Sequence, residues 1–246
     1  AIQTYIKLKD NLAKAFTEVE DIQKDIIRTY YADMAKHAGK VNSMHLQRVF
    51  ENIPEQLAKT EDQSTKRYKF QGVIPKKKQY SDLINVIDWL EATGLIHNVK
   101  ILEHAALPLS AYSKYNIFKL YLFDIGLLKS LSKVKTAEIL DYSLGQYKGY
   151  LVENFVLQEF VYNKTGDEKF YAWQGNAAEI EFLCDIDGKL IPVEVKSGSR
   201  TKAKSLASYI NKYDPEYGII LSGANTEIKA KVRKYPLYLA TKVLGS

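Results

Sequence analysis

The chain has 246 residues, of which 46% are hydrophobic and 26% charged, a composition typical of a folded globular protein and not of a disordered one. Lys and Arg exceed Asp and Glu by 35 to 29, and the resulting net charge of +6 permits binding to polyanions without requiring it. The single cysteine, Cys184, excludes a disulfide framework and a thiolate metal site, and it predicts a reducing, cytoplasmic compartment.

Two further classes of site have no support in the sequence. No apolar run reaches the roughly 20 residues that a membrane-spanning helix needs, so we expect no membrane association. No segment matches the G-x-x-x-x-G-K-[ST] pattern of a phosphate-binding loop, so we expect no ATP site within this sequence.

The first part of the chain is predicted to be helical and to end in a pair of strands. Apolar side chains recur at spacings of three and four, which is typical of amphipathic helices, and Gly39 and Gly94 are predicted to end two of them. The polar run over residues 60–69 is expected to be a loop or short strand. In chain order, the predicted helices cover residues 18–38, 44–53 and 81–93, and the predicted strands cover 95–102 and 118–124.

Three helices followed by a strand pair is the order of a winged helix-turn-helix module, which we predict over residues 41–140 after a linking helical region over 1–40. The lysines at 76–78 precede the third helix, where they can contact phosphates or form a solvated loop. The third helix itself carries Asp82 and Glu91 and no Arg or Lys, so we favour a packing or partner-binding module. A transcription regulator that reads a DNA sequence is the lower-ranked alternative.

From about residue 141 to 246 the pattern changes to that of an α/β domain. Helical and strand periodicities alternate, and each strand run is short and rich in apolar residues. The predicted helices cover residues 149–163 and 202–213, and the predicted strands cover 169–173, 179–184, 189–196, 218–221 and 235–239.

A hairpin is predicted at Asp187-Gly188, because a two-residue turn of this type needs a positive φ at both positions. The register of such a hairpin places Glu181 directly opposite Glu194, and Glu179 opposite Lys196. Since residues two apart on a strand share a face, these four charged side chains are predicted to project from one side of the sheet. The opposite side is predicted to be a core face, with Ile180, Phe182, Cys184, Ile191, Val193 and Val195.

Two carboxylates that face each other across a pair of strands repel each other. A shared proton, the ammonium group of Lys196 or a divalent metal can offset this repulsion, and oxygen ligands of this kind suit Mg²⁺ or Mn²⁺. Glu153 adds a further carboxylate close to the buried face of its predicted helix. The alternative interpretation is a row of solvated charges on a half-exposed sheet, with Glu153 a boundary residue that turns outward.

Six stretches of the chain resemble one family. Leu90–Ile96 (LEATGLI), Leu107–Leu109 (LPL) and Phe118–Leu128 (FKLYLFDIGLL) carry the resemblance upstream, and Gly149–Val156 (GYLVENFV), Ala178–Leu183 (AEIEFL) and Ile191–Ser197 (IPVEVKS) carry it downstream. Together they resemble the C-terminal region of prokaryotic AAA-type ATPases, which combines a winged helix with a PD-(D/E)XK nuclease-like domain. The resemblance extends over nearly the whole sequence.

This resemblance implies a restriction-endonuclease-like α/β domain with a mixed central sheet, working with an N-terminal ATPase module in the full-length protein. It implies that Glu181, Glu194 and the carbonyl group of Val195 hold the metal, that Lys196 is catalytic and that Glu153 is an accessory acid. The family usually has Asp at the position of Glu181, whose side chain is one methylene group longer.

Two functions follow as hypotheses. The first is a Mg²⁺- or Mn²⁺-dependent phosphodiesterase that acts on DNA. The second is a catalytically inactive module with the same fold, which binds nucleic acid or a partner and regulates the ATPase.

Overall fold

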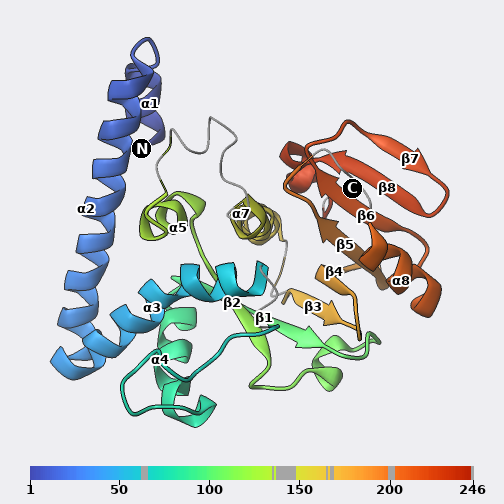
Figure 1. Ribbon diagram of the computed structural model, residues 1–246, viewed down its shortest axis with the longest axis horizontal. Helices are drawn as coiled ribbons and strands as arrows, with labels where there is room; N and C mark the ends of the chain where they lie inside the picture. Colours follow the sequence, from blue (N-terminus) through green and yellow to red (C-terminus); the bar gives the residue numbers. More distant parts are fainter. Residues whose placement is uncertain are drawn as a thin grey trace.

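The protein folds around a single mixed β-sheet (Figure 1). The computed structural model describes residues 1–61, 66–134, 136, 148–164, 166, 169–198 and 203–244. Within these residues eight strands are hydrogen-bonded in the order β2-β1-β3-β4-β5-β6-β8-β7, with both parallel and antiparallel pairs. The predicted α/β fold, a helical N-terminal part followed by a mixed sheet, is therefore confirmed.

The helices are α1 (Ile2–Lys7), α2 (Leu12–Ala38), α3 (Lys40–Glu61), α4 (Tyr80–Ala92), α5 (Ile125–Leu131), α7 (Lys148–Asn163) and α8 (Lys204–Tyr213), with short 3-10 helices η1 (Leu109–Tyr112) and η3 (Leu237–Lys242). The strands are β1 (Ile96–Leu102), β2 (Phe118–Leu122), β3 (Tyr171–Gln174), β4 (Glu179–Ile186), β5 (Lys189–Val195), β6 (Gly218–Ser222), β7 (Glu227–Lys229) and β8 (Val232–Pro236). None of the helices in the described ranges combines the length and the hydropathy that a bilayer span requires.

The N-terminal helices follow the predicted order, but their bounds differ: α1 was not predicted, α2 begins at Leu12 and not at residue 18, and α3 begins at Lys40 and not at residue 44. Helix α2 ends before Gly39, whose φ of 76° belongs to the left-handed region that glycine tolerates. Helix α3 does not end at residue 53 as predicted but runs through Pro54 to Glu61. Ile53 and Leu57 lie on either side of the proline and are almost fully buried. Their packing offsets the backbone hydrogen bond that Pro54 removes.

The two strands predicted as the wing are β1 and β2, and they are not a separate wing. β1 pairs antiparallel with β2 on one edge and parallel with β3 on the other, so the strand pair forms one end of the large sheet. The backbone N–H and C=O groups on the second edge of β1 form hydrogen bonds with β3, whereas in a separate wing they would have no partner strand. The predicted domain boundary between residues 140 and 141 lies outside the described residues.

The exposed side of α4 is acidic, as its sequence predicted. Asp82, Asp88 and Glu91 are all exposed. The side chain of Asp82 accepts hydrogen bonds from the backbone N–H groups of Lys78 and Gln79, both at 2.9 Å, and so caps the helix.

Helices α7 and α8 cover opposite faces of the sheet. Alternate residues of β4 divide between two hydrophobic clusters, because neighbouring side chains of a strand point to opposite faces. Phe182 packs in the cluster that includes Val156 and Phe160 of α7, whereas Leu183 packs with residues of α8. Figure 1 shows α2 standing apart from β4 to β8, with α5 and α7 between them.

The last part of the sheet differs from the prediction. Strand β8 ends at Pro236 and is followed by the 3-10 helix η3, so the strand predicted over residues 235–239 is largely wrong. A proline has no N–H group to donate to a neighbouring strand, which favours the end of β8 there. The short strand β7, which pairs with β8, was not predicted.

Asn154 of α7 ties this helix to the edge strand β2. Its side-chain oxygen accepts a hydrogen bond from Leu122 N–H, and its amide group donates one to the Leu122 carbonyl, both at 2.9 Å. Asn154 is fully buried, so water cannot replace either bond.

We predict that Asn154→Ala lowers the free energy of unfolding by roughly 2–4 kcal/mol, because it leaves a buried N–H group and a buried carbonyl group without partners. Urea unfolding followed by circular dichroism measures this loss. The control is Asn163→Ala in the last turn of the same helix, where we expect a loss of about 0.5 kcal/mol or less. Equal losses in the two variants would contradict the role given to Asn154.

Candidate functional site

The predicted acidic residues and Lys196 meet in one cleft between the start of β4, the end of β5 and the first turns of α7. Glu153, Glu179, Glu181 and Lys196 line this cleft, which has a volume of about 570 Å³. Lys119 of β2 also lines it, as does the backbone around Val195. We refer to it as the acid–lysine cleft.

Glu194 lies beneath the cleft and is fully engaged by the protein. Its side chain is 1% exposed, one carboxylate oxygen lies 2.7 Å from the Lys196 Nζ, and the other accepts a hydrogen bond of 3.0 Å from Leu206 N–H at the start of α8. Burial alone lowers the pKa of Lys196, but its hydrogen bond to Glu194 and the nearby charge of Glu181 outweigh burial and raise it. Lys196 is therefore positively charged at neutral pH.

Glu181 reaches across to β5. One of its carboxylate oxygens accepts a hydrogen bond of 2.9 Å from Val195 N–H. Burial, followed by the negative charges of Glu153 and Glu179, raises the pKa of the Glu181 carboxyl group well above its ordinary value, although Lys196 acts in the opposite direction. The structure therefore gathers more carboxylates here than its own lysines neutralise.

A β-bulge places Glu181 in this position. Tyr171 pairs with Leu183 and Trp173 with Ile180, so the two residues Glu181 and Phe182 lie opposite Ala172 alone. The predicted pairing of β4 with β5 is confirmed from Ile186↔Lys189 to Phe182↔Val193. The Asp187-Gly188 turn is confirmed as well, with φ values of 52° and 74°.

The bulge also makes two predictions wrong. The four charged side chains do not all project from one side of the sheet, because Glu179 pairs with Lys119 on the α7 side whereas Glu194 is bonded to α8 on the other face. Ile180 was expected on the same face as Phe182, yet the two residues belong to different hydrophobic clusters, on the α8 and α7 sides. An extra residue in one strand interrupts the alternation of side chains, and bulges commonly redirect a side chain next to a functional site.

Lys119 is the residue of the cleft that the sequence analysis missed. Its side chain is only 5% exposed, and its ammonium group lies 2.5 Å from a carboxylate oxygen of Glu179 and 3.6 Å from one of Glu153. The hydroxyl group of Tyr121 donates a hydrogen bond of 2.9 Å to the same oxygen of Glu153. Burial disfavours the charged form of Lys119, but Glu153, Tyr121 and Glu179 together raise its pKa well above its ordinary value.

One feature of the sequence points to Lys119. This lysine interrupts the otherwise apolar strand Phe118–Leu122, all of whose residues are buried in the fold. A buried ammonium group needs a partner of opposite charge, so such a lysine indicates that carboxylates lie nearby. The sequence does not say which carboxylates, because Glu153 and Glu179 come from α7 and β4.

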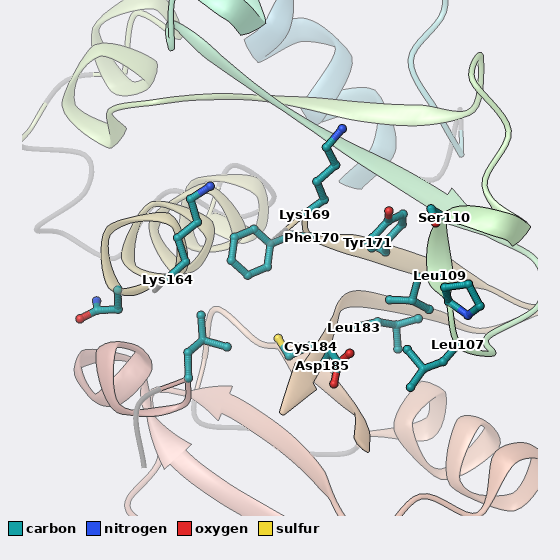
Figure 2. A pocket seen from close by; sticks show the side chains of 13 residues that line it. Leu107, Leu109, Ser110, Lys164, Lys169, Phe170, Tyr171, Leu183, Cys184 and Asp185 are labelled. Carbon is teal, nitrogen blue, oxygen red and sulfur yellow. The ribbon is translucent and has the colours of Figure 1, made fainter. Parts of the chain in front are cut away.

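A second cavity lies at the opposite end of β3 and β4 (Figure 2). It has a volume of about 390 Å³, and Leu109, Phe170 and Leu183 form much of its apolar lining, with Lys164 and Lys169 near its rim. Cys184 also lines it, but burial raises the pKa of this thiol to about 12, which keeps it protonated and unreactive at neutral pH. The paired acids and lysines belong to the acid–lysine cleft instead.

The fold and the cleft define an α/β protein whose sheet holds carboxylates and lysines at the end of one hairpin. A family model for a domain of unknown function (DUF8612) matches residues 8–138, more than half of the chain. The chain belongs to this family. A second family model, for another domain of unknown function (DUF4143), matches residues 148–240.

The domain described by the second model is typically found at the C-terminus of AAA-type ATPases, where an ATPase module accompanies it in the full-length protein. It contributes α7, α8 and strands β3 to β8, whereas Lys119 and Tyr121 come from the region matched by the first model. Neither a curated protein nor a solved structure matches the chain significantly.

The raised pKa of Glu181 predicts how stability changes with pH. The folded protein holds a proton on this carboxyl group that the unfolded chain releases above about pH 4.5, so this group stabilises the fold less as the pH rises from there toward its folded pKa. We predict that Glu181→Gln raises the free energy of unfolding at pH 8, and that this gain shrinks as the pH falls toward 4.5. Urea unfolding of both proteins over a series of pH values measures it.

Glu216→Gln is the matched control. Glu216 is exposed, and its hydrogen bond with Lys189 lowers the pKa of its carboxyl group, so this substitution is expected to give no gain at pH 8. A Glu181→Gln variant with the same gain at every pH would show that the carboxyl group does not titrate as described.

Proposed function

We propose that this chain is the C-terminal module of an AAA-type ATPase and that its acid–lysine cleft is a Mg²⁺- or Mn²⁺-dependent phosphodiesterase site acting on DNA. The observation that carries the proposal is the convergence of Glu153, Glu181, Glu194 and Lys196 at the end of one hairpin. These residues are the acid, the E-x-K pair and the accessory acid that the resemblance to PD-(D/E)XK nucleases implies, and their proximity supports the proposal.

The donor set suits a hard divalent cation. Glu181, Glu194 and the Val195 carbonyl group would supply oxygen atoms only, and Glu194 would bind a cation in place of its contact with Lys196. Burial, followed by the charges of Glu153 and Glu179, raises the pKa of Glu181, and a cation would offset those charges. Among the described residues, no group of three or more His, Cys, Asp or Glu is arranged to hold a metal ion. Mg²⁺ commonly takes only one or two protein carboxylates and completes its shell with water and substrate phosphate, so such a group is not required.

Each residue of the cleft has a role that its environment supports. A bound Mg²⁺ would lower the pKa of a water molecule and stabilise negative charge on the phosphate. Lys196 remains protonated because of Glu194 and Glu181, so it serves as a positive charge for the pentavalent phosphate and not as a general base. Leu206 N–H and Val195 N–H hold the carboxylates of Glu194 and Glu181 in place.

A specific observation favours a second candidate, a catalytically inactive module that binds nucleic acid or a partner and regulates the ATPase. The ammonium group of Lys119 already neutralises Glu153 and Glu179 from within the protein. A protein that balances its buried acids with its own lysine has less need of a metal ion. In this candidate the acid–lysine cleft is a structural ion-pair network.

Cleavage of DNA separates the two candidates. The first candidate predicts that the chain cuts plasmid or oligonucleotide DNA when Mg²⁺ or Mn²⁺ is added and stops when EDTA is added. Lys196→Ala is expected to slow cleavage by about 10²–10³-fold, because it removes a positive charge next to the reacting phosphate. Gel electrophoresis of labelled DNA measures the rate.

Lys189→Ala is the control, since Lys189 begins β5, the strand that Lys196 follows, and pairs with Glu216 on the surface. Cleavage that persists in EDTA, or that Lys196→Ala leaves unchanged, would exclude the first candidate. A folded chain that cuts no DNA with either metal supports the second.

Lys119→Met provides an independent measurement on the cleft. Without a metal ion, this variant is expected to lose about 3–5 kcal/mol of unfolding free energy, because Glu153 and Glu179 lose their buried partner. The first candidate predicts that millimolar Mg²⁺ restores part of this loss, and the second predicts that it does not. Lys114→Met, which breaks an exposed ion pair with Glu103, should cost at most about 1 kcal/mol and should not respond to Mg²⁺.

A further inference from the structure

We propose that another pocket, in the N-terminal part of the chain and distinct from the two cavities described above, binds single-stranded nucleic acid. It would stack a base on Tyr115 and pair phosphates with Arg67, Lys69 and Lys78. This aromatic–basic pocket has a volume of about 470 Å³ and lies between residues 67–71, the start of α4 and the turn before β2. It is separate from the acid–lysine cleft, and its binding of nucleic acid does not depend on hydrolysis there.

Tyr115 is the outermost ring of an aromatic cluster, with tilted and edge-to-face contacts, that continues into the core. Its side chain is 69% exposed, and its ring centroid lies 5.2 Å from that of Tyr80, which in turn lies 5.6 Å from Phe70. The ammonium group of Lys100 donates a hydrogen bond of 2.8 Å to the Tyr115 carbonyl and fixes the turn. An exposed aromatic ring on a rigid support is the platform on which nucleic-acid bases stack.

Hydrogen bonds hold the backbone of the two lysines near this ring in place. Lys69 is held by buried Gln56, which accepts a hydrogen bond from its N–H group and donates one to its carbonyl, both at 3.0 Å. Lys78 is held by the bond from its N–H group to Asp82. The side chains of Lys69 and Lys78 are exposed, as is that of Arg67, which also interacts within the protein, and no Asp or Glu is among the described residues that line the pocket. The pocket therefore favours an anion.

A further polar group lies in the pocket wall. Tyr68 is 3% exposed, and its hydroxyl group has no hydrogen-bond partner among the described residues. Leaving such a group unpaired costs free energy, but burial keeps this hydroxyl group out of reach of a ligand, so Tyr68 supports the pocket wall without contacting what binds there.

The position of the pocket relative to the acid–lysine cleft points to a strand of nucleic acid. Arg67 lines the aromatic–basic pocket and its neighbour Lys66 lines the cleft, so the two sites share one short segment of the chain. A duplex is disfavoured because only a single strand leaves the face of a base free to stack on a tyrosine ring.

Fluorescence anisotropy of a labelled oligothymidylate of roughly 16 nucleotides, with the full chain in EDTA, tests the inference. Tyr115→Ala is expected to weaken binding by at least about fivefold, since stacking of one base on an aromatic ring contributes about 1–3 kcal/mol. Tyr115→Phe should retain binding, because the ring remains. Lys78→Gln should reduce the slope of log affinity against log salt by about 0.7, the value expected for one phosphate contact on a single strand.

Tyr162→Ala is the matched control, because Tyr162 is an 85% exposed tyrosine on α7 away from the pocket. The inference is overturned if Tyr162→Ala weakens binding as much as Tyr115→Ala does. It is also overturned if the matching duplex binds as tightly as the single strand. An acidic peptide such as polyglutamate that competes equally well at the same charge would show a general anion site instead.

The binding experiment and the cleavage experiment test the two proposals separately. A chain that binds the oligonucleotide through Tyr115 but cuts no DNA supports this inference and excludes the phosphodiesterase. A chain that cuts duplex DNA in a Lys196-dependent manner, and binds single strands no better than Tyr115→Ala does, supports the phosphodiesterase and overturns this inference.

Discussion

The ion pairs of the buried Lys119 ammonium group connect the two halves of the molecule. A lysine this deep in a sheet is stable only where carboxylates surround it, and Glu153 and Glu179 supply them from α7 and β4. β2, α7 and the start of β4 must therefore meet at one point. The acid–lysine cleft exists because this requirement and the hairpin of β4 and β5 converge there.

The continuous sheet has a consequence for how the chain is divided. The two family models match segments that meet close to residue 140, yet the strands on both sides of that point are hydrogen-bonded through β1 and β3. Asn154 adds a second link, from α7 to the backbone of β2. The region matched by the first family thus supplies a charged residue and one end of the sheet to the site that the second family carries.

The balance of charge also shows why two functions fit the same cleft. Four glutamates face two lysines, and burial together with the negative charges of Glu153 and Glu179 raises the pKa of Glu181. A divalent cation and a proton are two ways to offset that charge, and they compete for the same carboxylate. The carboxylate of Glu181 is held at this position by a hydrogen bond from Val195 N–H on the neighbouring strand.

The sequence by itself determined the local features: the helix over residues 18–38 and its end at Gly39, the Asp187-Gly188 turn, the pairing of β4 with β5, and the proximity of Glu181, Glu194 and Lys196. Each of these depends on neighbours in the chain or on the geometry of one turn. Only the tertiary structure decided the rest. Helix α3 passes through Pro54 because core packing outweighs a local preference, and the bulge at Glu181 is set by pairing with β3. Lys119 reaches the cleft through contacts between segments more than 30 residues apart, which no local pattern encodes.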